Sequence, residues 1–389
     1  MQHKFAILCG FNQDNTLLTR KESHMKIQRI FLPVGQGAFY LEKHPNMNVV
    51  YDCGNLKKTK SGQNLVAQSL TKKDDIDILF ISHFDYDHVS LISILKKTVN
   101  KIKSVVIPLL DEKTKHLIIN INRAVENGTV TLIKNPKSFF DSDTKIIYTS
   151  IEFTEQDATI EIDSINDEEI ISGNTTLTTP VITYDWGFIP FNYKRLNRLN
   201  DLENELIKNG FDVSKLKENA DYTVDASINE RKKLKDIYNK LDGKINENSM
   251  LTYSGPINST EFMQECFIAS FFPRLLRSRF YSHSTCDVGC VYTGDSDLNK
   301  VDIKTVFKRV INSIGTIQIP HHGDINSYNS STFKSGEFIC PISYGIKNTY
   351  GHPSPIIISD LIANDCIPIH ITEDNDSYFI QHIHIVVSC

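Results

Sequence analysis

No stretch of the sequence approaches the ~18 consecutive apolar residues that a membrane-spanning helix requires. The apolar patch from Phe5 to Cys9 is too short for the hydrophobic region of a signal peptide, and no small-residue cleavage site follows it. We therefore expect a cytoplasmic protein with no membrane partner. Residues 1–25 are predicted to be an N-terminal extension, because Met25 stands directly before the first convincing strand.

Positive charge is not in excess either. The sequence has 42 lysines and arginines and 47 aspartates and glutamates, which gives a net charge of −5. No global basic field would therefore draw the protein onto nucleic acid or anionic lipid, and a polyanionic substrate would need a local basic site or a bound metal. The eight cysteines lack the spacing of a disulfide framework, so we expect most to be reduced and buried.

The remaining composition is that of a globular protein with a sizeable core. Apolar residues make up 40% of the 389, and 21 phenylalanines and 15 tyrosines must mostly be packed, which excludes disorder of the whole chain. Strand and helix patterns alternate from residue 26 to about 110, where Ile76–Ser82 and Lys103–Pro108 are apolar enough to be covered on both faces. Strand character returns from Ser249 onward. This order indicates an α/β fold.

The intervening segment has a different character. Residues 154–170 are acidic and poorly periodic, and residues 194–245 are rich in lysine, glutamate, asparagine and leucine with helical spacing. We interpret residues 154–247 as a separately packed helical insertion or cap outside the sheets. It contains no catalytic-looking cluster, so it is expected to contribute selectivity or to bind a protein partner.

The strongest chemical signal is His83-x-Asp85-x-Asp87-His88, directly after the buried strand at 76–82. Loops at the carboxyl ends of strands build the active sites of α/β folds. A tight loop can aim His83 and Asp85 at one metal and turn Asp87 and His88 toward a second. Imidazole and carboxylate together suit Zn, Mn or Fe better than Ca. The structural alternative, a helix cap made by Asp85 or Asp87, does not explain the two histidines.

Three later fragments repeat this arrangement. A strand ends in Gly-Asp at Asp295, another ends in His-His-Gly at His321 and His322, and Gly-His-Pro at His352 follows a third. Each fragment alone is weak evidence, because a Gly-Asp turn or a lone histidine is usually structural. Together they place a carboxylate and several imidazoles at the ends of successive strands.

With these motifs the sequence resembles the metallo-β-lactamase superfamily of metallohydrolases. It is most similar to the branch with the metallo-β-lactamase-like domain of ComEC-type DNA-uptake proteins, which has His-x-Asp-x-Asp-His in place of the commoner His-x-His-x-Asp-His. The resemblance covers residues 26–110 and 248–387. The other motifs that match in order are Val34–Gly37, Tyr51–Gly54, Asn248-Ser249, Thr293–Asp295, His321–Gly323 and Tyr350–Pro353.

The resemblance implies an αββα sandwich, divided into a first part at 26–153 and a second part at 248–389, with two divalent metal ions, Zn or Mn, at one edge. Asn248–Ser254 stands where the superfamily has a middle histidine ligand, so the first metal is expected to be ligand-poor and weakly bound. The implied roles are His83 and Asp85 for the first metal, Asp87, His88 and either His321 or His322 for the second, Asp295 as a bridge, and Asp52 as a residue that orients the ligands.

These roles imply a phosphodiesterase or nuclease that acts through a metal-bound hydroxide, with nucleic acid or another phosphodiester as substrate. Asp87 and His352 are the candidate catalytic residues. His352 would contact the scissile phosphate or protonate the leaving group, and the alternative is a structural loop histidine. Lys347 and Asn348 are further candidates for phosphate contacts.

Two other functions remain open at this level. One is hydrolysis of a small phosphodiester or ester, such as a cyclic nucleotide or phosphorylcholine, beneath the 154–247 segment. The absence of a strong basic stripe favours this alternative. The other is a subunit of a multi-protein defence or DNA-processing assembly, which the long insertion favours.

Overall fold

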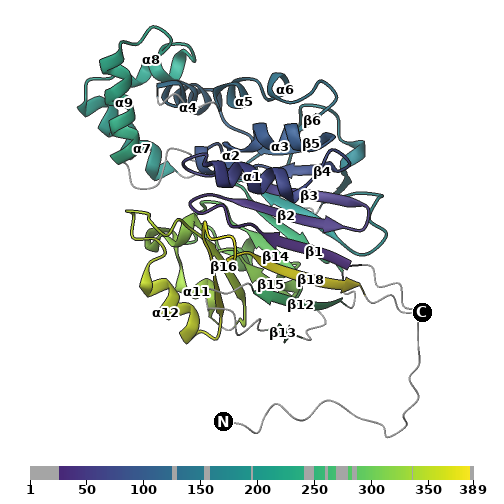
Figure 1. Cartoon of the computed structure of the whole chain (residues 1–389). Coiled ribbons are helices and arrows are strands. Elements are labelled where there is room, and N and C mark those ends of the chain that lie inside the picture. Colours follow the sequence, from purple (N-terminus) through teal and green to yellow (C-terminus); the bar gives the residue numbers. More distant parts are fainter. Residues whose placement is uncertain are drawn as a thin grey trace, which may run out of the picture.

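Two stacked β-sheets form the centre of the molecule, and helices cover the outer face of each (Figure 1). This helix–sheet–sheet–helix order confirms the predicted αββα sandwich. The predicted extension at residues 1–25 lies outside the described residues. The computed structural model describes residues 26–124, 129–152, 158–193, 196–240, 249–258, 262–268, 279–282, 287–334 and 336–385.

The first sheet has ten strands among the described residues. Strands β3 to β6 run parallel to one another. The apolar run predicted at 76–82 overlaps β4, whose last three residues are buried. In spatial order the strands are β13 (Arg279–Ser282), β12 (Phe262–Ile268), β18 (Phe379–Ile385), β1 (Lys26–Phe31), β2 (Phe39–His44), β3 (Met47–Cys53), β4 (Asp75–Phe80), β5 (Lys101–Pro108), β6 (Lys145–Thr149) and β8 (Glu169–Ile171).

The second sheet has eight strands within the described ranges. Strands β14 to β17 are parallel, so their carboxyl ends lie at the same edge. In spatial order the strands are β17 (Ile367–Ile371), β16 (Ile339–Ser343), β15 (Ile314–Ile317), β14 (Gly289–Tyr292), β11 (Leu251–Gly255), β10 (Gly187–Phe191), β9 (Thr176–Thr178) and β7 (Thr159–Glu161).

Helices close the sandwich on both sides. Over the first sheet lie α1 (Lys60–Ser69), α2 (Tyr86–Val89), α3 (Ile92–Thr98), α4 (Glu112–Ala124), α5 (Val130–Lys134) and α6 (Pro136–Phe139). Against the second sheet lie α10 (Ile303–Val306), α11 (Ser330–Phe333) and α12 (Pro355–Ala363). In the part of the chain that is described, no helix combines the length and apolar character needed to cross a membrane.

Aromatic rings fill the space between the two sheets. The ring of Tyr292 in the second sheet lies 3.7 Å from that of Tyr51 between centroids, and 5.7 and 5.8 Å from those of Tyr40 and Phe31. The last three residues belong to adjacent strands of the first sheet. The alternation of apolar side chains along these strands therefore builds the inner layer of the core.

A buried ion pair also joins the sheets. Arg29 Nε donates to Glu42 Oε1 at 2.6 Å, and neither side chain is exposed. Arg29 also donates to the carbonyl oxygens of Val288 and Ser254, and Glu42 accepts hydrogen bonds from the hydroxyls of Ser254 and Tyr292. Burial would raise the pKa of the Glu42 carboxyl, but Arg29 lowers it to about 2. The pair is thus fully ionised within the core.

The segment at 154–247 differs from the prediction of a helical insertion outside the sheets. The described residues of its first part form four strands, of which β8 joins the first sheet and β7, β9 and β10 join the second. All of β10 is buried and pairs with β11. The helical part is α7 (Leu196–Lys208), α8 (Val213–Glu218) and α9 (Ile228–Lys240). Three of the strands have only three residues, too few for a clear alternating pattern.

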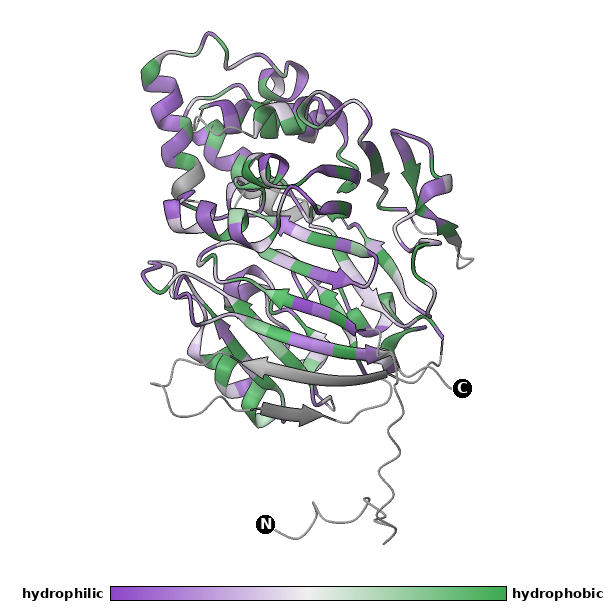
Figure 2. Cartoon of the chain, turned by 45° about the vertical axis from the view of Figure 1, so that its right-hand side comes forward, coloured by the Kyte–Doolittle hydropathy of each residue, from purple (hydrophilic) through white to green (hydrophobic). Residues whose placement is uncertain are grey.

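The helices α7 to α9 do not pack separately, contrary to the prediction. Their buried residues Leu206 and Leu234 belong to the same apolar cluster as the helices on the first sheet. Buried Asn120 of α4 donates to the carbonyl oxygen of Leu216 and accepts from the amide of Thr223. In Figure 2 the strands carry many hydrophobic residues, whereas these outlying helices carry long hydrophilic stretches. Deleting this segment would therefore uncover part of the core.

Candidate metal centre

Seven side chains that the sequence singled out lie together at the edge where the carboxyl ends of strands from both sheets meet. The loop after β4 and the short helix α2 that follows it together carry four of them, the loop after β14 carries one, and the turn after β15 carries two. Each has an exposed fraction of 7% or less. They are His83, Asp85, Asp87, His88, Asp295, His321 and His322.

Close packing fixes the backbone that carries Asp87. A Cβ atom added at Gly54 would lie 2.4 Å from the carbonyl oxygen of Asp87, and one added at Gly37 would lie 2.7 Å from it. The Ala38 amide donates to the same oxygen at 3.2 Å. The two glycine motifs near residues 34–37 and 51–54 therefore let neighbouring loops approach the metal-ligand loop.

Asp52 is hydrogen-bonded to the segment that carries the candidate ligands. Its carboxylate accepts hydrogen bonds from the amide and hydroxyl of Ser82, both at 2.7 Å, and lies 2.8 Å from His88 Nδ1. Its φ of 52° is in the left-handed region, which aspartate adopts more readily than most residues. The structure thus places Asp52 against the candidate ligands, as the orienting role requires.

One group of potential ligands joins His83, His88 and Asp295. His83 Nε2 lies 3.4 Å from Asp295 Oδ2, and His88 Nε2 lies 3.1 Å from Asp295 Oδ1. The three ligand atoms lie within 4.8 Å of one another. Asp85 Oδ2 borders the group at 3.6 Å from His83 Nε2, and the Asp85 side chain does not cap α2. This geometry favours the metal interpretation of Asp85 over the helix-cap alternative.

A second group joins Asp87, His88 and His322, again with ligand atoms within 4.8 Å. His322 Nε2 lies 3.2 Å from Asp87 Oδ2. His321 Nε2 instead lies 3.6 Å from Asp295 Oδ2. Both adjacent histidines therefore point into the centre, and His322 is the one beside Asp87 and His88. His88 belongs to both groups, whereas the sequence assigned it to the second metal alone.

All four imidazoles are held through Nδ1 and direct Nε2 toward the centre. Metal-ligating histidines bond in this way, because a partner on the other ring nitrogen fixes the orientation of the ring. The Nδ1 partners are Ser82 Oγ for His83 at 2.9 Å, Asp52 Oδ2 for His88 at 2.8 Å, Asp324 Oδ2 for His321 at 3.2 Å and the Ser343 carbonyl oxygen for His322 at 2.7 Å.

The donor atoms fit a divalent cation. His83 Nε2, His88 Nε2 and Asp295 Oδ1 are buried and make no hydrogen bond within the described part of the chain. Buried polar atoms without such partners are rare and call for an explanation. A metal ion would satisfy all three, and this mixture of imidazole and carboxylate suits Zn or Mn.

The charges in the cluster are compatible with a bound cation. Burial would raise the pKa of the Asp295 carboxyl. The imidazoles of His321, His88 and His83 nevertheless hold this pKa well below its usual range. Burial would lower the pKa of the His88 imidazole, but the carboxylates of Asp295 and Asp52 hold it well above its usual value. The buried carboxylates thus require positive charge, which either protons or a divalent cation can supply.

The backbone at the two adjacent histidines is strained. His321 and His322 have φ values of 49° and 57° in the left-handed region. Such conformations cost ~1–3 kcal/mol each for residues other than glycine and cluster at functional sites. Here they turn consecutive side chains into one centre, which an ordinary strand or helix would not do.

Sequence analysis missed three residues that support the centre. Ser82 and Asp324 hold the imidazoles of His83 and His321. Ser249 Oγ accepts a hydrogen bond from the Asp295 amide at 3.0 Å, so the stretch that stands in the place of the middle ligand positions the loop of Asp295. Their position could have identified two of these residues, because Ser82 and Asp324 directly flank the two histidine motifs.

His352 lies at the border of the centre. Its ring centroid is 5.6 Å from that of His321, and its Nε2 is 3.9 Å from Asp324 Oδ1. Burial would raise the pKa of the Asp324 carboxyl, but the hydrogen bond to His321 holds it well below its usual range. A carboxylate therefore lies between the two imidazoles.

Asn348 differs from its predicted role as a phosphate contact. It donates to the carbonyl oxygens of Gly345 and His352 and accepts from the amides of Tyr350 and His352. Both amide hydrogens are used inside the loop, so Asn348 shapes the loop that carries His352. Lys347 is exposed and lines a neighbouring pocket.

We expect Asp52→Asn to lower metal affinity by roughly 10–100-fold, the usual effect of losing a partner of a ligating histidine. Asparagine tolerates the left-handed backbone and keeps the shape, but its uncharged side chain cannot support the ring of His88 equally well. Competition with a chromogenic chelator measures the affinity. An affinity equal to that of the wild type would contradict the orienting role of Asp52.

No protein-family model matches the sequence, and no curated protein matches it. Solved structures with similarity include the metallo-beta-lactamase fold protein YhfI from Bacillus subtilis, with 12% identity, a TM-score of 0.24 and coverage of 44% of this chain. That match spans only 54% of YhfI.

Two further structures match over most of their length. Human tRNase Z, short form, has 9% identity and a TM-score of 0.36, and the match covers 90% of this chain and 92% of that one. Unliganded yeast PDE1 has 9% identity and a TM-score of 0.37, with 93% and 100% covered. These values are low, and the interpretation of the site rests on this chain's own geometry.

Proposed function

We propose that the protein is a metal-dependent hydrolase of phosphodiester bonds, with nucleic acid as its substrate class. The observation that carries this proposal is the convergence of four Nδ1-anchored imidazoles on buried carboxylates. The seven potential ligands gathered in this cluster are enough for two ions. When bound, such a pair of divalent cations supplies a nucleophilic oxygen at neutral pH and neutralises the charge that grows on a phosphoryl group.

The distances between the ligand atoms suggest how the candidate ligands would be shared between two ions. Asp295 is the proposed bridge, because its Oδ1 faces His88, which belongs to both groups, and its Oδ2 faces His83 and His321. Asp85, His83 and His321 would complete one site, while Asp87, His88 and His322 would form the other. The side chains of Asp52, Ser82, Ser249 and Asp324 keep this set in place before substrate arrives, so little reorganisation is needed.

His352 is the candidate general acid in this proposal. It lies beside the centre and not within either ligand group, and it is close enough to Asp324 for the carboxylate to orient its ring. From there it would donate a proton to the oxygen of the leaving group.

We therefore expect His352→Gln to retain metal while turnover of a phosphodiester falls by ~10²–10⁴-fold, the scale of general acid–base catalysis. Turnover and metal content are measured on the same preparation. Because Asp324 also contacts His321, an Asp324→Asn variant is expected to lose metal affinity as well as turnover. If His352→Gln loses its metal, His352 is a ligand and the assignment as acid is wrong.

The proposed function is tested with metal-free and metal-loaded protein on single-stranded DNA, double-stranded DNA, RNA and bis-p-nitrophenyl phosphate. The proposal predicts turnover that depends on Zn or Mn and includes at least one nucleic acid. Turnover of none of these four would refute a phosphodiesterase. Turnover of bis-p-nitrophenyl phosphate that a small cyclic diester inhibits and an oligonucleotide does not would favour a small-molecule enzyme.

A further inference from the structure

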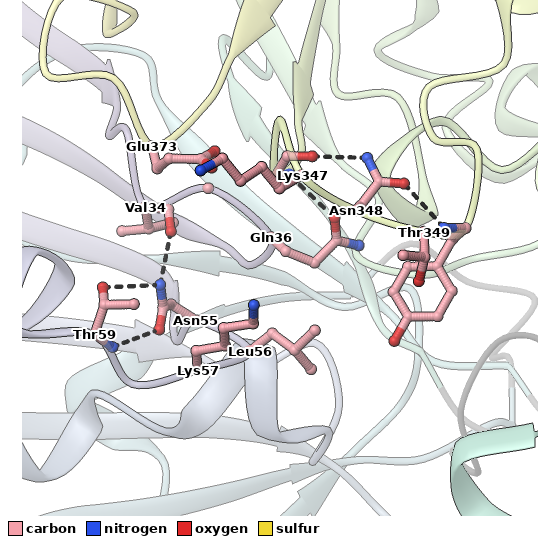
Figure 3. Close-up of a pocket in the computed structure, with 13 residues that line it drawn as sticks. Val34, Gln36, Asn55, Leu56, Lys57, Thr59, Lys347, Asn348, Thr349 and Glu373 are labelled. Atoms are coloured by element: carbon pink, nitrogen blue, oxygen red, sulfur yellow. Dashed lines mark hydrogen bonds between the residues drawn. The ribbon is translucent and has the colours of Figure 1, made fainter.

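A pocket of about 240 Å³ lies beside the candidate metal centre. Figure 3 shows that one wall comes from the segment with Asn55 and Lys57 after β3, and the facing wall from the segment with Lys347 and Thr349 after β16. Gln36, from the loop between β1 and β2, lies between them and accepts the Gly345 amide through Oε1. The pocket is therefore built at the ends of β1, β3 and β16, and β3 and β16 lie next to β4 and β15, whose ends carry candidate ligands.

Two connections join this pocket to the metal centre. Tyr350 lines the pocket, and its ring lies 5.9 Å from that of His352, which in turn lies 5.6 Å from that of His321. Between the walls, the loop of Gln36 continues to Ala38, whose amide donates to the Asp87 carbonyl oxygen. A substrate whose reacting group is at the centre would extend naturally into the pocket.

The pocket is preformed, because its walls are held by internal hydrogen bonds. Asn55 binds the Val34 carbonyl oxygen and the Thr59 amide, while Asn348 closes its own loop. Glu373, the acidic residue of the lining, accepts the Ile346 amide at 2.9 Å. These residues shape the pocket, and other side chains remain to contact a ligand.

The remaining side chains combine positive charge with an aromatic ring. Lys57 and Lys347 are both exposed, and neither makes an ion pair within the residues that the structure describes. The lining contains these two lysines and one glutamate, so its net charge is positive. Tyr350 is 50% exposed, which leaves ring surface accessible. A phosphate and a planar base are the groups that such a combination recognises.

We propose that this pocket binds one nucleotide next to the scissile phosphodiester of a single-stranded nucleic acid. The base would stack on Tyr350, and the flanking phosphate would lie near Lys57 and Lys347. A volume of about 240 Å³ is below the roughly 300–1,000 Å³ of sites for drug-sized ligands, so the pocket has room for at most one nucleotide and not for a duplex. An unpaired base can stack on protein, whereas a paired base is held in the helix. This inference rests on the proposed function and names its substrate.

The test is binding of a fluorescent phosphorothioate oligothymidylate, which keeps its charge and resists hydrolysis, to the metal-loaded full chain at several salt concentrations. Lys57→Ala and Lys347→Ala are each expected to reduce the slope of log affinity against log salt by about 0.7, the share of one phosphate contact in a single strand. Lys232→Ala, on exposed α9 outside the pocket, is the matched control and should leave the slope unchanged.

The aromatic contact is tested separately. Tyr350→Ala should weaken binding roughly tenfold, while Tyr350→Phe keeps the ring and should bind as the wild type does. Salt slopes and affinities equal to those of the wild type in all pocket variants would overturn the subsite. Because binding is measured without turnover, that failure is distinct from failure of the proposed function, in which no phosphodiester is hydrolysed by the wild type.

Discussion

Replacement of Asp295 by asparagine is expected to abolish metal-dependent hydrolysis and strip metal from the protein. The Asp295 carboxylate faces three imidazoles, and their positive charge or that of a cation compensates it. Asparagine has the same shape, so no cavity forms, but it offers one neutral oxygen in place of two charged ones. We expect turnover to fall by roughly 10⁴-fold or more, the scale of removing one member of a catalytic unit.

Turnover of bis-p-nitrophenyl phosphate and metal content measure this effect, and circular dichroism checks the fold. Asp302→Asn is the matched control, because Asp302 is an exposed helix cap of α10 and not part of the centre. The control should keep both metal and activity. An Asp295→Asn protein that retains wild-type metal content would contradict the bridging assignment.

The largest effect on stability is expected from Glu42→Gln. Within the residues that the structure describes, the buried Arg29 guanidinium would lose its only charged partner, and a glutamine nitrogen would face hydroxyls that now donate to Glu42. Breaking one partner of a buried pair costs about 3–5 kcal/mol of unfolding free energy. Urea unfolding of the purified protein measures the loss. Asp143→Asn, which removes the partner of Lys101 in a largely exposed pair, is the control and should leave the midpoint unchanged.

The same pair predicts a pH dependence. Because folding lowers the pKa of Glu42 from 4.5 to about 2, its contribution is fully present above pH 4.5 and is lost as the pH falls toward 2. In Glu42→Gln this part of the acid dependence should disappear. An equal loss of stability between pH 4.5 and 2 in wild type and variant would show that other carboxyl groups dominate.

The sequence predicts the strands of the fold where apolar runs are long, as in β4 and β5, because burial on both faces leaves a continuous signal. It does not predict β7, β8 and β9, because three residues cannot show a period. The sequence also does not predict that α4 and α8 share one apolar core. The contacts of Asn120 with Leu216 and Thr223 join residues about one hundred positions apart, and helical spacing reveals an apolar face but not its partner.

For the site too, the sequence predicts features within one short segment better than contacts between distant segments. The loop from His83 to His88 is evident in the sequence because four potential ligands fall within six residues. The sequence does not reveal which of His321 and His322 lies beside which ligand, because their directions depend on two successive residues with left-handed backbone conformations. The contact of His88 with Asp52 crosses 36 positions, and only the motif resemblance suggested it.

The most direct test of the metal centre is elemental analysis of the protein after equilibration with Zn or Mn and removal of excess metal. We predict that the wild type retains up to two ions per chain, one for each of the two proposed sites, and that Asp295→Asn retains few or none. A wild-type protein that carries no more metal than Asp295→Asn, while both are folded, would contradict the claim that these imidazoles and carboxylates form a metal centre.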